Sequence, residues 1–127
     1  MPLKSLQPNP AWDRESHESI VDAFEVLAAD GSVEIHVWGG DWCGDTRREL
    51  PNVGATLEAA EFPDERLHVH EVDGEKQGDL VGVYDVELIP TIVIEREGEE
   101  LVRFAESERL PAPAYLATAL REAGVVA

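Results

Sequence analysis

A strand, a tight turn and a long helix in immediate succession constrain the fold of this chain most. The run VEIHVW at 33–38 is rich in β-branched and aromatic residues, which favours a strand. The glycines of GGDWCGD at 39–45 then indicate a turn. A helix is expected over about 43–61, with Pro51 inside it, where a missing backbone donor should produce a kink. Its predicted buried face consists of Leu50, Val53, Leu57 and Ala60.

The rest of the pattern favours one α/β domain spanning residues 1–127. Residues 1–11 hold three prolines and no periodicity, which predicts an irregular N-terminal arm. The order of elements predicts a central mixed sheet of about four or five strands with helices on both faces, parallel strands first and an antiparallel hairpin last. The remaining expected elements are a helix over 16–29, a strand over 67–72, a weakly helical segment over 74–86, strands over 91–95 and 101–105 around a Glu97–Gly98 turn, and a last helix carrying Leu116, Leu120 and Ala123.

The charge of the chain limits its partners. It has 27 acidic and 10 basic residues, for a formal net charge of -17. An acidic surface repels phosphate backbones and anionic lipids, so we expect neither nucleic acid nor membrane as a partner. Acids scattered over every segment resemble the surfaces of proteins from salt-loving microbes, although a merely acidic protein of an ordinary organism gives the same count.

The same sequence indicates where the chain works and how it is built. The N-terminus lacks the basic start and apolar middle of a signal peptide, and the chain has no apolar run long enough to span a membrane. We therefore expect a cytoplasmic protein. One cysteine excludes an internal disulfide, so oxidation can link Cys43 only to another chain or to a small thiol. We expect a monomer, with a disulfide-linked dimer through Cys43 as the alternative.

Cys43 is the candidate reactive group. At a helix N-terminus, unpaired backbone N–H groups and the helix dipole favour a thiolate over a thiol. Asp41 and Asp45 oppose that shift by like-charge repulsion, and the neighbouring arginines at 47 and 48 offset them, so its net direction stays open. Thr46 stands where a C-x-x-C pair would have its second cysteine, and its hydroxyl is expected within hydrogen-bonding reach of the sulfur. The alternative is a buried structural cysteine that behaves as a small hydrophobe.

These features together resemble the thioredoxin superfamily over most of the chain. The resemblance rests on W-C-G-D-T at 42–46, on Pro51 inside the following helix, and on I-P-T at 89–91 before the hairpin. It implies a thioredoxin-like fold and thiol–disulfide exchange, with a cis bond before Pro90 and that proline packed against Cys43. The partner it implies is a disulfide-bearing protein or a small-thiol disulfide, paired with a strand edge.

The resemblance also implies a set of site residues. Cys43 and Thr46 are the implied catalytic residues. The implied substrate-binding residues are Trp42, Gly44, Asp45, Ile89, Pro90 and Thr91.

Two departures from the family pattern define the expected mechanism. Thr46 replaces the resolving cysteine, and Val37 stands where many thioredoxins have a buried acid. Both losses affect the step in which a second thiol releases the substrate. We therefore expect a monothiol route that uses an external low-molecular-weight thiol and no bound cofactor.

Three alternatives to this mechanism stay open. The chain could be a binding module that kept the fold and lost catalysis. It could share an iron–sulfur cluster between two chains, or it could be an engineered trapping variant in which Thr46 replaces a natural cysteine.

The histidines offer a second set of candidate ligands. His68 and His70 share one face of a strand, and His36 lies on a strand expected alongside. No fourth ligand accompanies them, so we expect strand histidines on a half-exposed face and no metal.

Overall fold

The computed structural model describes residues 3–75, 77–106 and 108–127. Its central sheet has four strands in the order β2-β1-β3-β4. The strands are β1 (Val33–Gly39), β2 (Leu67–Glu71), β3 (Thr91–Arg96) and β4 (Glu99–Ala105). β1 pairs parallel with β2 and antiparallel with β3, and β3 pairs antiparallel with β4. The predicted mixed sheet with a final hairpin is confirmed.

The three long helices are α1 (Glu18–Ala29), α2 (Gly44–Ala59) and α3 (Ala112–Glu122). Pro51 lies inside α2, as the sequence predicts. Gly124 follows α3 with φ of 76°, the left-handed conformation that glycine adopts without strain. The β3–β4 turn puts Glu97 and Gly98 at φ of 52° and 83°, which suits a tight hairpin. Short 3₁₀ turns at Lys4–Leu6, Arg14–His17 and Asp64–Arg66 complete the described elements.

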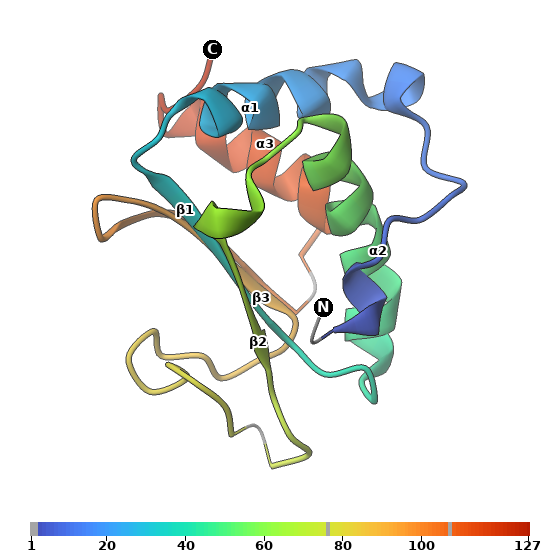
Figure 1. Cartoon of the computed structure of the whole chain (residues 1–127), viewed down its shortest axis with the longest axis vertical. Coiled ribbons are helices and arrows are strands. Elements are labelled where there is room, and N and C mark those ends of the chain that lie inside the picture. The colour runs from blue at the N-terminus through green and yellow to red at the C-terminus, as the bar shows by residue number, and fades with distance from the viewer. Residues whose placement is uncertain (1–2, 76, 107) are drawn as a thin grey trace.

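All three helices cover one face of the sheet, which differs from the expectation of helices on both faces. Figure 1 shows α1, α2 and α3 on the same side of the sheet. Val33, Ile35 and Val37 of β1 belong to one core cluster with apolar residues of these three helices. The opposite face is covered by residues 72–75 and 77–90, called here the connecting segment. These residues form turns and bends where a weakly helical segment over 74–86 was expected, because three glycines weaken helical propensity there. Residue 76 of that expected segment lies outside the described residues.

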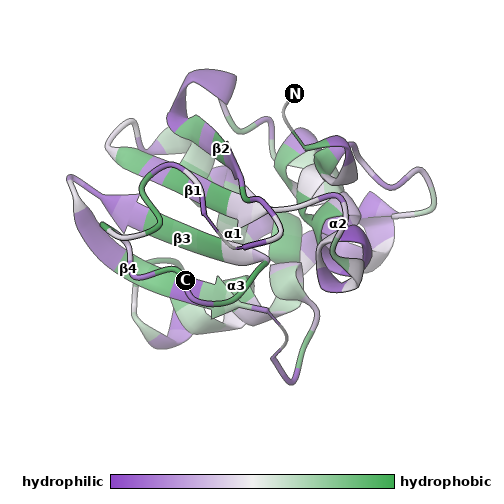
Figure 2. Ribbon diagram, turned by 90° about the horizontal axis from the view of Figure 1, so that it is seen from below, coloured by the Kyte–Doolittle hydropathy of each residue, from purple (hydrophilic) through white to green (hydrophobic). Residues whose placement is uncertain are grey.

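The N-terminal arm is part of the core. Leu3 and Leu6 are 0% and 1% exposed and pack against α2, around the 3₁₀ turn Lys4–Leu6. Figure 2 shows apolar residues concentrated in the strands and in the inner sides of the helices. In the described part of the chain, no helix is both long and apolar enough to cross a bilayer. The core therefore lies between one helical layer and the sheet, and the connecting segment closes a second, smaller cluster.

Candidate functional site

Cys43 lies at the junction that the sequence indicates. It is the N-cap residue of α2, in extended conformation, and its side chain is partly exposed. The backbone N–H of Cys43 donates to the Gly40 carbonyl at 2.9 Å, which closes the turn after β1. The Arg47 N–H donates to the Cys43 carbonyl at 3.1 Å and begins α2. The end of a buried strand and the start of a helix thus fix the sulfur at the surface.

The sulfur faces the connecting segment. Cys43 Sγ lies 4.0 Å from the carbonyl oxygen of Ile89, within hydrogen-bonding reach for sulfur. The Ile89–Pro90 peptide bond is cis. Pro90 is buried, and Cys43 packs against the small cluster that contains Ile89 and Trp38. The W-C-G-D-T and I-P-T motifs therefore meet at one place.

Thr46 does not take the position expected for its hydroxyl. The side chain is 0% exposed, and its Oγ1 accepts a hydrogen bond from the Gly40 N–H at 3.3 Å. Within the described part of the chain, no hydrogen bond joins this hydroxyl to the Cys43 sulfur. The first turn of α2 directs Thr46 inward, toward the backbone of the turn, so its role is to hold the turn that presents Cys43.

Trp42 is the exposed aromatic group beside the sulfur. Its side chain is 50% exposed, and its indole N–H donates to the Val72 carbonyl at 2.9 Å. That bond fixes the ring between the turn and the start of the connecting segment. Gly44 is exposed on the first turn of α2. Both residues can contact a molecule that approaches Cys43.

Thr91 does not contribute a free backbone to this surface. It is 1% exposed and lies in β3, a central strand, paired with Trp38 on one side and Ala105 on the other. The Pro90 carbonyl accepts from the Glu106 N–H at 2.7 Å. The backbone carbonyl in contact with the sulfur is that of Ile89, and the docking role expected of Thr91 stays a prediction.

The charged neighbours of Cys43 are already paired. The Asp41 carboxylate accepts from the Lys4 and Ser5 N–H groups at 3.0 and 2.9 Å and from the Ser5 hydroxyl at 2.6 Å. Burial opposes its ionisation, but these hydrogen bonds outweigh burial and lower the pKa of Asp41. Asp45 pairs with Arg48 at 2.6 Å. The two acids expected to repel a thiolate thus point to other partners.

The surroundings of the histidines differ from those expected. His36 is 7% exposed, whereas a half-exposed face was predicted, because Tyr84 of the connecting segment covers it. The His36 ring stacks on those of His68 and His70, and His36 Nδ1 lies 3.0 Å from His70 Nε2. Among the described residues, no group of three or more histidine, cysteine or acidic side chains has the geometry of a metal site. Sequence periodicity alone did not reveal this cover, since it comes from a segment without regular structure.

Comparisons with known proteins agree with this geometry. A family model described as Thioredoxin matches residues 16–114. Thioredoxin Y1, a chloroplastic protein of Arabidopsis thaliana, is 26% identical over 91 residues, which cover 71% of this chain and 51% of the relative. The chain thus spans about half the length of that curated relative.

Two solved structures have a similar fold. The germline-specific thioredoxin Deadhead of Drosophila melanogaster has a TM-score of 0.52 at 20% identity, covering 86% of this chain and 91% of that one. Mitochondrial thioredoxin 3 of Saccharomyces cerevisiae has a TM-score of 0.51 at 16% identity, covering 78% and 86%. At these identities the likeness concerns the fold alone.

Proposed function

Because the chain belongs to the thioredoxin family, we propose that it is a thiol–disulfide oxidoreductase that works through one sulfur, Cys43. The observation that carries the proposal is the position of this sulfur. It is partly exposed at the start of α2, and it lies beside the carbonyl that precedes the cis Ile89–Pro90 bond. A buried structural cysteine would have neither the exposure nor the neighbouring polar backbone.

The proposed reaction has two exchange steps. The Cys43 thiolate attacks one sulfur of a substrate disulfide; a Cys43–substrate disulfide forms, and the second substrate sulfur leaves as a thiolate and takes up a proton. An external thiol, as its thiolate, then attacks the substrate sulfur of this mixed disulfide. That step releases Cys43 as a thiolate and leaves the substrate joined to the external thiol. A second external thiol reduces that product, so two external thiols are oxidised to their disulfide for each substrate disulfide reduced.

The external thiol is required because the chain supplies no second thiol. Cys43 is its only cysteine. Thr46, one turn further along α2, is buried and uses its hydroxyl oxygen to accept from Gly40. A hydroxyl is also a far weaker nucleophile than a thiolate at neutral pH. Thr46 therefore supports the turn, and the resolving step passes to the small thiol.

The substrate is proposed to lie across Trp42 and the connecting segment. Trp42 and Leu88 are 50% and 40% exposed, so apolar surface is available near the sulfur. Ile89 supplies the backbone that an extended substrate would pair with, in the manner of strand addition. Gly44 and Asp45 border the sulfur on α2, where the absence of a side chain at Gly44 leaves room for close approach.

Turnover of a labelled mixed disulfide tests this function. The substrate is a fluorescent peptide joined by a disulfide to a small thiol; Cys43 takes the small-thiol sulfur and releases the peptide as a thiol. Excess small thiol then attacks the Cys43-bound small-thiol sulfur, which frees Cys43 as a thiolate and forms the small-thiol disulfide. The unmodified protein should turn over many equivalents, at a rate that rises with thiol concentration, and Cys43→Ser should reduce this to the uncatalysed rate. A Thr46→Val variant, which removes the hydroxyl at nearly constant volume, should keep the same thiol dependence.

The alternative is a binding module that kept the fold and lost catalysis. It predicts that unmodified protein and Cys43→Ser bind the peptide equally and that neither turns over the disulfide. Full activity in Cys43→Ser would exclude the proposed route altogether.

A further inference from the structure

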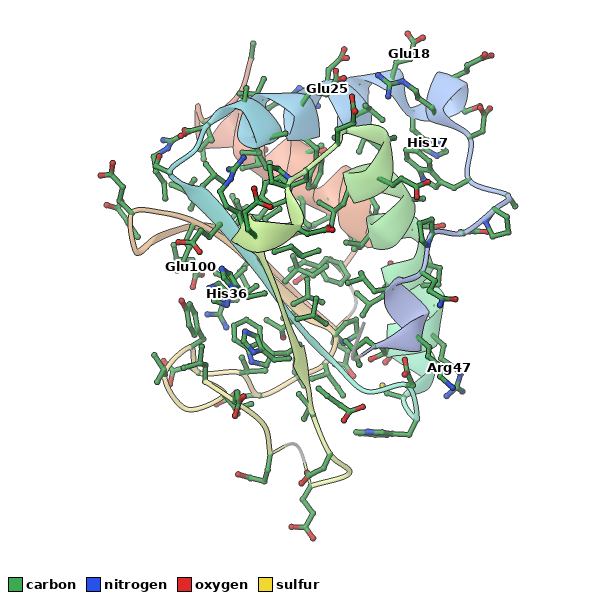
Figure 3. All side chains as sticks on the ribbon, in the orientation of Figure 1. His17, Glu18, Glu25, His36, Arg47 and Glu100 are labelled. Carbon is green, nitrogen blue, oxygen red and sulfur yellow. The ribbon has the colours of Figure 1, made fainter. Side chains whose placement is uncertain are left out.

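Histidine, aromatic and acidic side chains form a cluster, separate from the Cys43 site, on the sheet face that lies away from the helices. Figure 3 shows His36 projecting from β1 toward the connecting segment. His36 and Glu95 are both 7% exposed, so polar groups are buried here under the segment. We call this group the histidine stack. It consists of His36 and Trp38 on β1, His68 and His70 on β2, Glu95 on β3, and Tyr84 in the connecting segment.

Hydrogen bonds in the stack fix where its protons lie. The Glu95 carboxylate accepts from the Tyr84 hydroxyl at 3.0 and 3.1 Å, and its Oε1 lies 3.1 Å from His36 Nε2. A carboxylate accepts, so this contact suits the His36 tautomer that has its proton on Nε2. His36 Nδ1 lies 3.0 Å from His70 Nε2. Two nitrogens at this separation share a single proton, and a second proton between them turns a bond into a repulsive contact.

The rings also lie too close together to hold several positive charges. The His36 ring centroid is 4.6 Å from that of His68 and 5.3 Å from that of His70. Burial, together with the neighbouring rings, lowers the pKa of His70; for His36, burial lowers the pKa more than Glu95 raises it. One charge can be balanced by Glu95, and His68 contacts Glu34. Further protonation places unbalanced charge among stacked rings.

Charged and titratable groups reach the stack from every element packed against it. Those facing His36 and His70 are Glu34 on β1, His68 on β2, Glu95 on β3, and Asp79 and Tyr84 in the connecting segment. Glu100 and Arg103 of β4 lie beside Tyr84. The acids offset the positive charge of protonated histidines only in part, because burial lowers the pKa of His36 more than the acids raise it.

The stack is one attachment of the connecting segment to the sheet, beside the bonds from Arg103 of β4 to the Tyr84 and Asp85 carbonyls. The Tyr84 ring lies against His36 and Trp38, at centroid distances of 4.9 and 5.1 Å. The Trp38 indole N–H donates to the Asp79 carbonyl at 2.8 Å. The segment then continues to Ile89, whose carbonyl faces the Cys43 sulfur. A change in the stack therefore reaches the site through a single stretch of chain.

We propose that the histidine stack is a pH-sensitive fastening of the connecting segment: neutral rings hold Tyr84 and the segment against the sheet, and protonation of His36 and His70 releases them. The loosening itself depends only on the stack. Its consequence, slower exchange at Cys43 in acid, rests on the function proposed above, because a loose segment no longer holds Ile89 beside the sulfur.

The direction of the effect follows from proton binding. In the unfolded or loosened chain these histidines titrate near their ordinary pKa of 6.5, and in the folded chain the pKa values lie lower. The loosened form therefore binds protons more readily. The fastening is complete above about pH 6.5 and is lost as the pH falls below that value toward the folded pKa values. Ordinary carboxylates stay largely ionised down to about pH 5 and do not contribute to this window.

Hydrogen exchange measured by mass spectrometry tests the proposal at pH 7.5 and 5.5, with rates corrected for the intrinsic effect of pH. Peptides from the connecting segment should exchange faster at pH 5.5, by up to about ten-fold for each histidine that is protonated only in the loosened form, since the ordinary pKa of 6.5 lies one unit above this pH. Peptides from α1 should not change. Equal protection of the segment at both pH values in the unmodified protein would overturn the proposal.

Two variants separate the stack from general acid effects. His70→Phe keeps a flat ring against Trp38 but removes the shared proton, and it should lose most of the acid response. His17→Phe is the matched control, since His17 stacks on Trp12 outside this cluster, and it should respond like the unmodified protein. An undiminished acid response in His70→Phe would also overturn the proposal.

The hydrogen-exchange measurement does not depend on the proposed function. It can be made in Cys43→Ser, where no thiol chemistry occurs. If the segment loosens in acid while the active-site assay shows no turnover at any pH, only the proposed function fails. If turnover occurs and the segment is equally protected at both pH values, only the fastening fails.

Discussion

The Cys43 sulfur lies 4.0 Å from the carbonyl oxygen of Ile89, although 46 positions separate the two residues in the chain. The contact joins the N-terminus of α2 to the end of the connecting segment. It places a partly exposed thiol beside backbone that precedes β3, so a disulfide held along that backbone would present its sulfur to Cys43.

Trp42 is predicted to bind substrate rather than to support the fold. Its ring is half-exposed, so Trp42→Ala should change the free energy of unfolding little. It should raise KM for the peptide disulfide about ten-fold, or ~1.4 kcal/mol, with little change in kcat. Val26→Ala is the control, because Val26 is a similarly exposed apolar side chain, 47% exposed, on α1. An equal KM in the two variants would show that Trp42 does not contact substrate.

Asp41 is predicted to anchor the N-terminal arm to the turn before Cys43. Asp41→Asn removes the charge that accepts three hydrogen bonds from Lys4 and Ser5, and should lower the free energy of unfolding by about 1 kcal/mol at pH 7. The pKa of Asp41 is lowered from 3.8 in the fold, so this stabilisation is present above about pH 3.8 and disappears as the pH falls through the folded value. Urea unfolding of both proteins across this range should show a difference that shrinks in acid. A constant difference would contradict the anchor.

Gly54 is predicted to be required where the N-terminal arm crosses α2. A Cβ there would lie 1.9 Å from the Leu6 carbonyl oxygen, a backbone atom that cannot rotate away. Alanine gains about 1 kcal/mol over glycine in a helix interior, but the overlap should outweigh this gain. Gly54→Ala should therefore lower the free energy of unfolding by about 1–3 kcal/mol.

Gly31 provides the control for this substitution, since a Cβ at Gly31 meets nothing within 4 Å. Gly31→Ala should stay within about 0.5 kcal/mol of the unmodified protein in urea unfolding. If Gly54→Ala proved as stable as Gly31→Ala, the arm would not lie against α2 as described.

Arg66 is predicted to be a main stabilising residue outside the apolar core. Its guanidinium donates to several backbone carbonyls around the end of α1 and stacks over Phe62 at 4.9 Å. Arg66→Lys should cost about 2 kcal/mol in urea unfolding, because an ammonium cannot reproduce the planar fork of donors. Exposed Arg109 serves as the control, and Arg109→Lys should be neutral. The carbonyls that Arg66 contacts are those of Leu27, Ala28, Asp30 and Val33, at 2.6–3.3 Å.

The regular elements could be predicted from the sequence because their signals are local. Alternating and helical spacing of apolar residues located β1, α1 and α2 to within a few residues. The connecting segment could not be predicted, since its glycines and isolated apolar residues fit no period and its structure depends on what it covers. Its cover over His36 comes from Tyr84, which is 48 positions away.

The site shows the same division between local and long-range information. The placement of Cys43 at the N-terminus of α2 follows from the strand–turn–helix pattern. Its neighbour Ile89 was indicated by the resemblance to thioredoxins. The inward direction of Thr46 was not evident, because it depends on the Gly40 N–H donating to the Thr46 hydroxyl oxygen. The burial of Leu3 and Leu6 was also missed, since an arm with three prolines has no periodicity to indicate a buried face.

The most direct test of the single-sulfur mechanism is the intact mass of the protein after it is mixed with the peptide disulfide in the absence of small thiol. The account predicts a one-to-one Cys43–substrate adduct that persists until small thiol is added and then disappears. In Thr46→Cys the adduct should be resolved within the chain, leaving a protein two mass units lighter than its reduced form. No adduct on the unmodified protein, or an adduct that is lost without any added thiol, would contradict the mechanism.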